Sequence, residues 1–135
     1  MIKYTFDGEF PPTVGTKGAA GLDLCAQTVT NNIISTGVRV EIPSGWVGIL
    51  LPRSSWGAKG WTLANTVGVI DSDYRGEIMA SMAKRFGAGF DNIKPGDKVC
   101  QLIVIRAAGG FEQVSTEQLS VTERGDGAFG STGGA

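Results

Sequence analysis

One aspartate stands out as a candidate for chemistry because its surroundings are mostly apolar. Asp71 follows the run Gly68-Val69-Ile70, and Tyr74 comes three residues after it. A carboxylate in such a stretch is either a solvated turn residue or a working general base, and turn residues are the commoner case. Both interpretations remain open on the residues alone.

A second segment carries residue types that suit an anion. Pro52-Arg53-Ser54-Ser55 follows a predicted buried strand and would open a single helical turn within residues 52–59. The start of such a turn directs free N–H groups outward, and two serine hydroxyls and a guanidinium charge would complete a phosphate site. An ordinary connection from a strand to a turn, with serine as the cap, is the alternative.

The C-terminal residues 123–135 have an unusual composition, with five glycines and Phe129 as the one large apolar residue. Such a segment cannot build a core of its own. It is either a frayed tail or a flexible lid. As a lid, its amides and hydroxyls would wrap an anion while the phenyl ring stacks on a flat ligand.

Two features of the composition narrow the chemistry. The chain has no histidine, which excludes Ser-His-Asp and Cys-His nucleophiles and histidine-ligated zinc. Its two cysteines, Cys25 and Cys100, form either one disulfide or two reduced, buried thiols, and the lack of a secretory signal favours the thiols. Hydrolysis would therefore depend on carboxylates, hydroxyls, backbone dipoles, Lys or Arg, and an oxygen-bound metal.

The elements that must position these residues are short strands. The 135 residues suit one domain, and 21 glycines are too many for a helical protein. Alternating or continuous apolar residues predict strands at 38–42, 46–51, 77–83 and 99–105, with turns at 43–45 and 94–97. The prediction is an all-β, jelly-roll-like antiparallel sandwich or barrel in residues 1–120, followed by a flexible arm in residues 121–135.

Charge and hydropathy indicate a soluble, cytoplasmic protein. The net charge is −1 and basic residues do not cluster, so nucleic acid is not an expected partner. No apolar stretch approaches the roughly 20 residues that cross a bilayer. The first residues lack the apolar core and cleavage site of a signal peptide.

Taken together, five segments resemble the ordered motifs of the trimeric dUTPase family, the deoxyuridine 5′-triphosphate nucleotidohydrolases. The resemblance extends from about residue 15 to residue 133 and includes every candidate above. The segments are Ala20-Gly21-Leu22-Asp23-Leu24, Pro52-Arg53-Ser54-Ser55, Asn65 through Glu77, Gly96-Asp97-Lys98-Val99-Cys100-Gln101-Leu102, and Arg124 through Gly133.

The resemblance implies an activity and an assembly. A homotrimer would hydrolyse dUTP to dUMP and pyrophosphate by attack of water on the α-phosphorus, with Mg²⁺ as cofactor. Asp71 would orient the water and accept from the sugar 3′-OH. Asp23, on its own a plausible turn former, would reach Mg²⁺ through water. One subunit would supply the segments around Asp23, Arg53 and Gln101, a second the Asp71 segment, and a third the arm.

The resemblance also implies roles in substrate binding. Asn65 and the backbone of a hairpin within residues 65–77 would read uracil, and Tyr74 would reject a 2′-hydroxyl. Asp73 would shape that hairpin, and Asp97 would brace Arg53. Serine and alanine replace frequent family glycines at positions 55 and 128. The predicted substrate-binding residues are Arg53, Ser54, Ser55, Asn65, Gly68, Val69, Ile70, Tyr74, Met79, Gln101, Arg124, Phe129, Gly130, Ser131 and Thr132.

In this set, each polar or aromatic side chain has an expected contact. Gln101 would contact phosphate near the catalytic water, and Arg124 would pair with the γ-phosphate. Phe129 would stack over uracil while residues 130–132 wrap the terminal phosphates. Two other functions remain open: a dCTP deaminase of the same fold, and a regulator that senses dUTP and contacts a protein partner.

Overall fold

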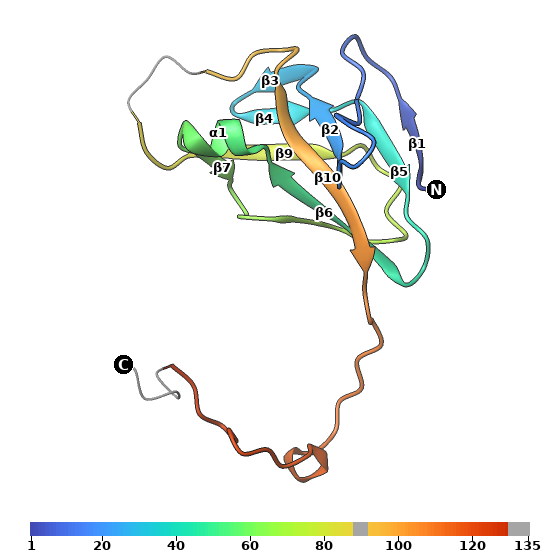
Figure 1. Ribbon diagram of the computed structural model, residues 1–135, viewed down its shortest axis with the longest axis vertical. Helices are drawn as coiled ribbons and strands as arrows, with labels where there is room; N and C mark the ends of the chain where they lie inside the picture. Colours follow the sequence, from blue (N-terminus) through green and yellow to red (C-terminus); the bar gives the residue numbers. More distant parts are fainter. Residues whose placement is uncertain (88–91, 130–135) are drawn as a thin grey trace.

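The computed structural model describes residues 1–87 and 92–129, which form ten strands and two short helices (Figure 1). No helix among these residues is long and apolar enough to cross a membrane. The elements are β1 (Lys3–Phe6), β2 (Leu22–Cys25), β3 (Thr28–Thr30), β4 (Ile33–Ser35), β5 (Val38–Glu41), β6 (Trp46–Pro52), α1 (Ser54–Ala58), β7 (Trp61–Leu63), β8 (Gly68–Ile70), β9 (Met79–Lys84), β10 (Lys98–Arg106) and the 3-10 helix η1 (Thr116–Gln118).

The strands form two four-stranded sheets and a two-stranded ribbon. One sheet has the order β2-β10-β6-β8 and the other β3-β4-β9-β7, while β1 pairs with β5. All of these pairings are antiparallel. The predicted all-β, jelly-roll-like sandwich is confirmed, and the four predicted strands correspond to β5, β6, β9 and β10.

The core lies between the two sheets, because each contributes one face of apolar side chains. Leu50 and Leu102 come from the first sheet, and Ile34, Ala80 and Met82 come from the second. The period-2 pattern that predicted β5 is visible in its burial, which alternates from buried to exposed along the strand. Each fully buried large aliphatic side chain contributes roughly 1.5–3 kcal/mol of transfer free energy.

Strand β6 is the element on which the functional residues depend. It pairs with β10 along one edge, where Gln101 lies opposite Leu51, and with β8 along the other, where Ile70 lies opposite Gly48. At Gly48 an added Cβ would come within 2.8 Å of Ile42 and 3.0 Å of Ile70. A glycine is therefore needed at position 48 so that the side chains of Ile42 and Ile70 can pack against the backbone of β6.

A register shift in β10 sets the geometry beside the end of β6. Lys98 pairs with Cys25 and Cys100 with Leu24, so Val99 is an extra residue relative to β2. The Val99 carbonyl accepts a 2.7 Å hydrogen bond from the amide of Arg53. Because Pro52 has no N–H to donate, this bond continues the pairing of the two strands beyond it.

One expectation about pairing is wrong. Residues 65–77 do not form a hairpin, because β8 pairs with β6 whereas β9 pairs with β4 and β7. The segment instead passes from one sheet to the other through a turn at Asp71 to Tyr74, closed by a 3.1 Å bond from the Tyr74 amide to the Asp71 carbonyl. Asp73 lies in this turn, which connects the sheets instead of two arms of a hairpin.

The chain leaves the sandwich at the end of β10. The Ala107 amide bonds the Gly45 carbonyl at 2.9 Å, and the Arg106 guanidinium lies 5.0 Å from the centre of the Trp46 ring. Beyond this point the described residues extend away from both sheets (Figure 1). Phe111 and Val121, at 102% and 98% relative exposure, contribute nothing to the core.

Candidate active site

The first group of predicted residues lies on one face of the β2-β10-β6 sheet. Asp23 and Gln101 are direct cross-strand partners, and Gln101 is also opposite Leu51 on β6. Directly opposed residues share a face of an antiparallel sheet, and this face is the one turned away from the core residues Cys100 and Leu102. The register therefore brings the two predicted residues Asp23 and Gln101 together on one face of the sheet.

Asp23 is held from three sides. Its backbone exchanges two hydrogen bonds with Thr13, of 2.7 and 3.1 Å, and β10 pairs with the other edge of its strand. Its carboxylate lies 3.4 Å from Nε of Arg53, where the two side chains are 14% and 37% exposed. Sequence and register thus bring a carboxylate, a guanidinium and the Gln101 amide side chain to adjacent strands.

This ion pair corrects the expected role of Asp97. The Asp97 carboxylate accepts a 2.8 Å bond from the Lys94 amide and closes its own turn instead of bracing Arg53. The described ion pair of Arg53 is with Asp23. The reason is topological: Asp97 precedes the register shift at Val99, whereas Asp23 lies opposite Gln101 beyond it.

The helical turn expected after Pro52 is present as α1. Arg53 is its N-cap residue, and its carbonyl accepts bonds from the Trp56 and Gly57 amides at 3.0 and 3.1 Å. Ser54 and Ser55 occupy the exposed first turn, where amides have no acceptor within the helix. Buried Trp56 anchors the turn in the core, so the two serines and Arg53 present donors at the end of β6.

The second group of predicted residues lines a cavity of about 210 Å³, here called the Asp71 cavity. Sequence reasoning placed five of its residues together but missed Glu77 and Ile78, which follow the same turn. Ile78 is buried and directly precedes β9. The lining residues are Val69, Ile70, Asp71, Tyr74, Glu77, Ile78 and Met79.

Tyr74 is folded back over its own turn. Its hydroxyl donates a 2.8 Å bond to the Glu77 carbonyl, and its ring occupies the space that a side chain at position 76 would need. Gly76 has an ordinary, non-left-handed φ, so it is the ring and not the backbone that requires a glycine. Tyr74 and the exposed residue Asp71 both line the Asp71 cavity.

Gly68 and Asn65 lie outside that lining. Gly68 is buried against Leu50, whose Cβ would be 2.9 Å from an added Cβ, so glycine lets β8 pack on β6. The Asn65 side chain donates a 3.0 Å bond to the Val67 carbonyl in its own turn. Asn65 is exposed and not among the residues that line the Asp71 cavity.

The described part of the arm, residues 121–129, does not reach either group of residues within its own chain. Arg124 bonds the Gly127 carbonyl through Nε at 2.8 Å, and Phe129 is 107% exposed. Both predicted contact residues are therefore exposed, and the described segment that carries them lies away from the sandwich (Figure 1). The predicted residues Gly130, Ser131 and Thr132 lie outside the described residues.

The two groups of residues lie at opposite ends of β6. Ile70 pairs with Gly48, which places Asp71 near the start of β6, whereas Arg53 directly follows its last residue. A strand rises about 3.3 Å per residue, so the two sites are roughly 20 Å apart along β6. The Asp71 cavity and the Arg53 group therefore do not form one site in a single chain.

The capacity to bind a metal rests on one carboxylate. In residues 1–87 and 92–129 no group of three or more Asp, Glu or Cys side chains converges as a ligand cage. The acidic group beside the anion-binding residues is Asp23, whose neighbours are Arg53 and Gln101. A lone carboxylate suits Mg²⁺, which keeps several waters and takes further ligands from substrate phosphates.

Both cysteines are free and buried, as predicted. Burial raises the pKa of the Cys100 thiol to about 12. Burial also raises the pKa of Cys25, and the nearby Lys98 charge partly opposes this shift. Neither thiol is therefore a nucleophile near neutral pH.

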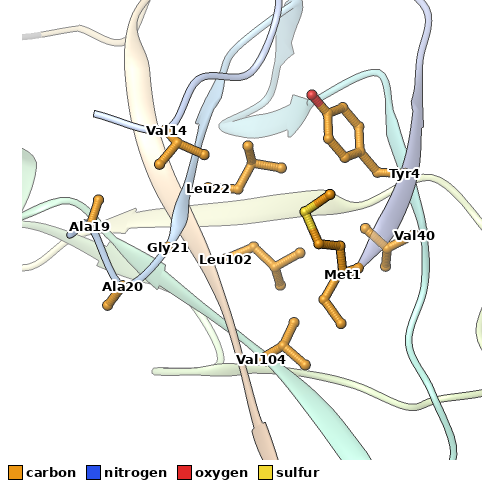
Figure 2. A pocket seen from close by; sticks show the side chains of 11 residues that line it. Met1, Tyr4, Val14, Ala19, Ala20, Gly21, Leu22, Val40, Leu102 and Val104 are labelled. Atoms are coloured by element: carbon orange, nitrogen blue, oxygen red, sulfur yellow. The ribbon is translucent and has the colours of Figure 1, made fainter. Parts of the chain in front are cut away.

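A further cavity of about 390 Å³ was not foreseen from the sequence (Figure 2). It lies between β1, β2 and β10 and is lined mainly by apolar residues, with Tyr4 and Val14 at 46% and 58% exposure. We call it the apolar cavity. Its lining residues are Met1, Ile2, Tyr4, Val14, Ala19, Ala20, Gly21, Leu22, Val40, Leu102 and Val104.

Comparison with known proteins identifies close similarity along nearly the whole chain. The family model described as dUTPase matches residues 10–133. The deoxyuridine 5′-triphosphate nucleotidohydrolase of Escherichia phage T5 is 39% identical over 135 residues, covering 90% of both chains. That of Pseudomonas fluorescens (strain SBW25) is 41% identical over 137 residues, covering 93% of this chain and 89% of its own.

Solved structures show the same fold. A Staphylococcus bacteriophage 80alpha dUTPase mutant with dUpNHpp superposes with a TM-score of 0.81 at 22% identity, over 98% of each chain. A mutant dUTPase from phage phi11 of S. aureus, described with a structural Mg(II) ion, has a TM-score of 0.68 at 23% identity. That match covers 84% of this chain and 96% of the other.

Proposed function

The chain belongs to the dUTPase family, and on that premise we propose that it hydrolyses dUTP to dUMP and pyrophosphate. The observation that carries the proposal is the Asp71 cavity, which Asp71 and Tyr74 line together. Its volume of about 210 Å³ suits a part of a nucleotide and not all of it. The triphosphate then extends beyond the cavity.

In this reaction a water molecule attacks the α-phosphorus in line with the departing pyrophosphate. Asp71 orients the water, accepts a proton from it as the new P–O bond forms, and receives a hydrogen bond from the sugar 3′-OH. The bond between the α-phosphorus and its bridging oxygen breaks, and the bridging oxygen leaves with pyrophosphate. General base assistance of this kind is worth about 10²–10⁴-fold.

Tyr74 and the strand before Asp71 select the nucleoside. The Tyr74 ring packs against the deoxyribose and leaves no space for a 2′-hydroxyl. The backbone of Val69 and Ile70, which line the cavity, reads the polar edge of uracil. Gly68 supports this strand by packing on Leu50, and Asn65 reaches the base if its bond to Val67 opens. Met79 lines the same cavity as an apolar wall.

The Arg53 group binds the triphosphate. The guanidinium of Arg53 and the first-turn donors of Ser54 and Ser55 offset phosphate charge, and Gln101 donates to a phosphate oxygen. Asp23 would hold Mg²⁺ through water. When bound, this ion supplies positive charge that stabilises the pyrophosphate leaving group.

We further propose that the active enzyme is a homotrimer with its sites between subunits. The α- and β-phosphorus atoms of a nucleotide are joined through one oxygen, whereas Asp71 and Arg53 are roughly 20 Å apart along β6. This separation supports a second subunit as the source of one of the two groups. The described residues beyond β10 extend away from their own sandwich, which supports a third subunit as the acceptor of the arm (Figure 1).

The apolar cavity supports association between copies of the chain. Its exposed Tyr4 and Val14 would lose contact with water at a subunit interface, which contributes about 25 cal/mol per Å² of apolar surface.

The arm completes the site when it closes. Arg124 pairs with the γ-phosphate, Phe129 stacks over uracil, and Gly130, Ser131 and Thr132 wrap the phosphates.

Because dUTP is an intracellular metabolite, this activity implies a cytoplasmic enzyme.

The activity is tested by pyrophosphate release from dUTP, dTTP, dCTP and UTP, with and without Mg²⁺. The expected result is Mg²⁺-dependent release from dUTP well above the other three nucleotides. Ammonia released from dCTP would instead identify a deaminase, and tight dUTP binding with no pyrophosphate would identify a sensor. Either outcome contradicts the proposal.

The shared site is tested by mixing two inactive variants, Asp71→Asn and Arg53→Ala. If the two groups come from different subunits, unfolding and refolding the variants together creates hybrid trimers in which some sites have both native residues. Activity then returns to a fraction of the wild-type value. If the refolded mixture stays as inactive as each variant alone, the site does not lie between subunits.

A further inference from the structure

The turn that carries Asp71 and Tyr74 separates two cavities. Tyr74 lines the Asp71 cavity, whereas the next residue, Arg75, lines a second cavity of about 330 Å³. We call this second space the β1–β5 cavity, because β1 and β5 supply the rest of its lining, including Lys3, Arg39 and Glu41. Adjacent residues of one short loop therefore connect the candidate active site with the β1–β5 ribbon.

The Arg75 side chain closes this loop on itself. Its Nη1 donates hydrogen bonds to the Ser72 carbonyl at 2.6 Å and to the Tyr74 carbonyl at 3.2 Å. A charged donor makes such bonds stronger than those between neutral groups. The two carbonyls flank Asp73, so the guanidinium fixes the curvature of the turn that begins at Asp71.

Arg39 ties the same loop to β5. Its Nη1 donates to the Arg75 carbonyl at 3.1 Å, and its backbone is held opposite Thr5 in the β1–β5 ribbon. Charge attraction adds little, because the approach of Arg75 to Glu41 is 4.0 Å and both side chains are more than half exposed. The directional bonds to carbonyls are what connect the ribbon to the loop.

The far end of the loop is anchored independently. The Glu77 carboxylate accepts a 2.9 Å bond from the Gly37 amide, and the Glu77 carbonyl accepts the Tyr74 hydroxyl at 2.8 Å. On the near side, Ile70 is paired with β6. Between these anchors, the 3.1 Å bond from the Tyr74 amide to the Asp71 carbonyl closes the turn, and the bonds that Arg75 and Arg39 donate to the turn carbonyls reinforce it and tie it to β5.

We propose that Arg75 and Arg39 are positioning residues for the hydrolysis of dUTP, acting through the loop and not by contact with the nucleotide. Arg75 sets the shape of the turn, and Arg39 fixes that turn relative to the β1–β5 ribbon. Together they determine how the Asp71 carboxylate and the Tyr74 ring meet the substrate. This inference rests on the proposed function of the Asp71 cavity.

The test compares Arg75→Met with the wild type. Methionine keeps much of the aliphatic stem but removes the donors, so the Ser72 and Tyr74 carbonyls lose their shared partner. Displacement of a catalytic group by about 1 Å costs up to 10²-fold, so kcat for dUTP should fall by about 10- to 100-fold. The preference for dUTP over UTP should fall as well, because Tyr74 moves with the loop.

Two further variants distinguish positioning from general destabilisation. Arg75→Lys retains donors and should recover part of the lost kcat, while the melting temperatures of both Arg75 variants stay near that of the wild type. Arg39→Met should lower kcat less than Arg75→Met. The double variant should lose less than the product of the two effects, because both residues act on one loop.

Lys3→Met is the matched control, since it removes a cation from the β1–β5 cavity without removing a described bond to the loop. Its kcat and its nucleotide preference should equal those of the wild type. The inference is overturned if Arg75→Met keeps wild-type kcat and dUTP preference. It is also overturned if Lys3→Met lowers kcat and the dUTP preference as much as Arg75→Met does. The positive charge in the β1–β5 cavity would then be the cause of both losses.

A binding measurement separates this inference from the proposed activity. A wild-type protein that does not hydrolyse dUTP contradicts the proposed function, whatever the variants do. Calorimetric affinities for dUMP and UMP then test the loop by itself. A reduced preference for dUMP in Arg75→Met supports the positioning role, and an unchanged preference refutes it.

Discussion

Replacing Gly76 with alanine should change the selectivity of the enzyme while leaving its stability almost unaltered. A Cβ at this position would lie 2.3 Å from Oη, 2.5 Å from Cζ and 2.7 Å from Cε1 of Tyr74. The backbone φ of Gly76 is compatible with alanine, so the ring must yield and not the chain. To reach ordinary contact distance the ring must move by roughly 1 Å.

The stability terms nearly cancel. Displacement of the ring breaks the 2.8 Å bond from the Tyr74 hydroxyl to the Glu77 carbonyl, which costs about 0.5–1.5 kcal/mol for a neutral pair. Alanine in place of glycine restricts the unfolded chain and returns about 0.4–1 kcal/mol. The net change in the free energy of unfolding should therefore be below about 1 kcal/mol.

For selectivity, no second effect opposes the displacement of the Tyr74 ring. Tyr74 faces the proposed deoxyribose position, and a shift of about 1 Å near a reacting group costs up to 10²-fold. We expect the ratio of kcat/KM for dUTP to that for UTP to fall at least about tenfold. Steady-state pyrophosphate release measures this ratio, and urea unfolding of the same preparations measures stability.

Gly18→Ala is the matched control, because its added Cβ meets no atom within 4 Å and its φ is not left-handed. It should alter neither quantity. The reasoning is refuted if Gly76→Ala keeps the wild-type ratio for dUTP over UTP. A loss of several kcal/mol in the Gly76 variant would likewise show that the backbone, and not the Tyr74 ring, yields to the new methyl group.

Three other predictions follow from the site and the core. Asp71→Asn should bind a non-hydrolysable dUTP analogue with near wild-type affinity in calorimetry but lose about 10²–10⁴-fold in kcat; near-normal turnover would exclude Asp71 as the base. Deletion of residues 123–135 should abolish most dUTP turnover with little change in melting temperature, because the described part of this segment adds no buried side chain; a large fall in melting temperature would contradict this. A thiol reagent at pH 8 should label Cys25 and Cys100 only in denaturant. Burial raises the pKa of Cys100 from 9.0 to about 12. The contribution of the un-ionised Cys100 thiol to the free energy of unfolding is therefore complete below pH 9 and is lost as the pH rises through 12. The free energy of unfolding from urea titrations should fall across this window, and rapid labelling of the folded protein would refute the burial argument.

The sequence predicted the strands whose apolar residues alternate with polar ones or form a continuous apolar run. The alternation in Val38 to Glu41 and the apolar runs of β6 and β10 each identify a strand without reference to its partner. Pairing is a different matter, because β8 joins β6 and leaves β9 to the opposite sheet. Hydrophobic period does not say which strand lies beside which.

The residues of the candidate site also differ in whether local sequence or strand pairing brings them together. Asp71, Tyr74 and Met79 are close in the chain and line one cavity, as expected. The partner of Arg53 was misassigned, since Asp23 is distant in sequence and the register shift at Val99 decides which carboxylate reaches it. The apolar cavity also went unnoticed, because its wall joins residues from the N-terminus and from β10.

The extra residue at Val99 has a consequence for how this protein tolerates change. Val99 and Cys100 are consecutive and both are buried, so the alternation of faces along β10 is interrupted at the register shift. Deleting Val99 would restore regular pairing with β2 and leave Gln101 opposite Asp23. The Arg53 amide would lose its acceptor, because Val99 supplies that carbonyl. The extra residue therefore matters for the end of β6, where the Arg53 group begins, and not for the pairing of β10 with β2.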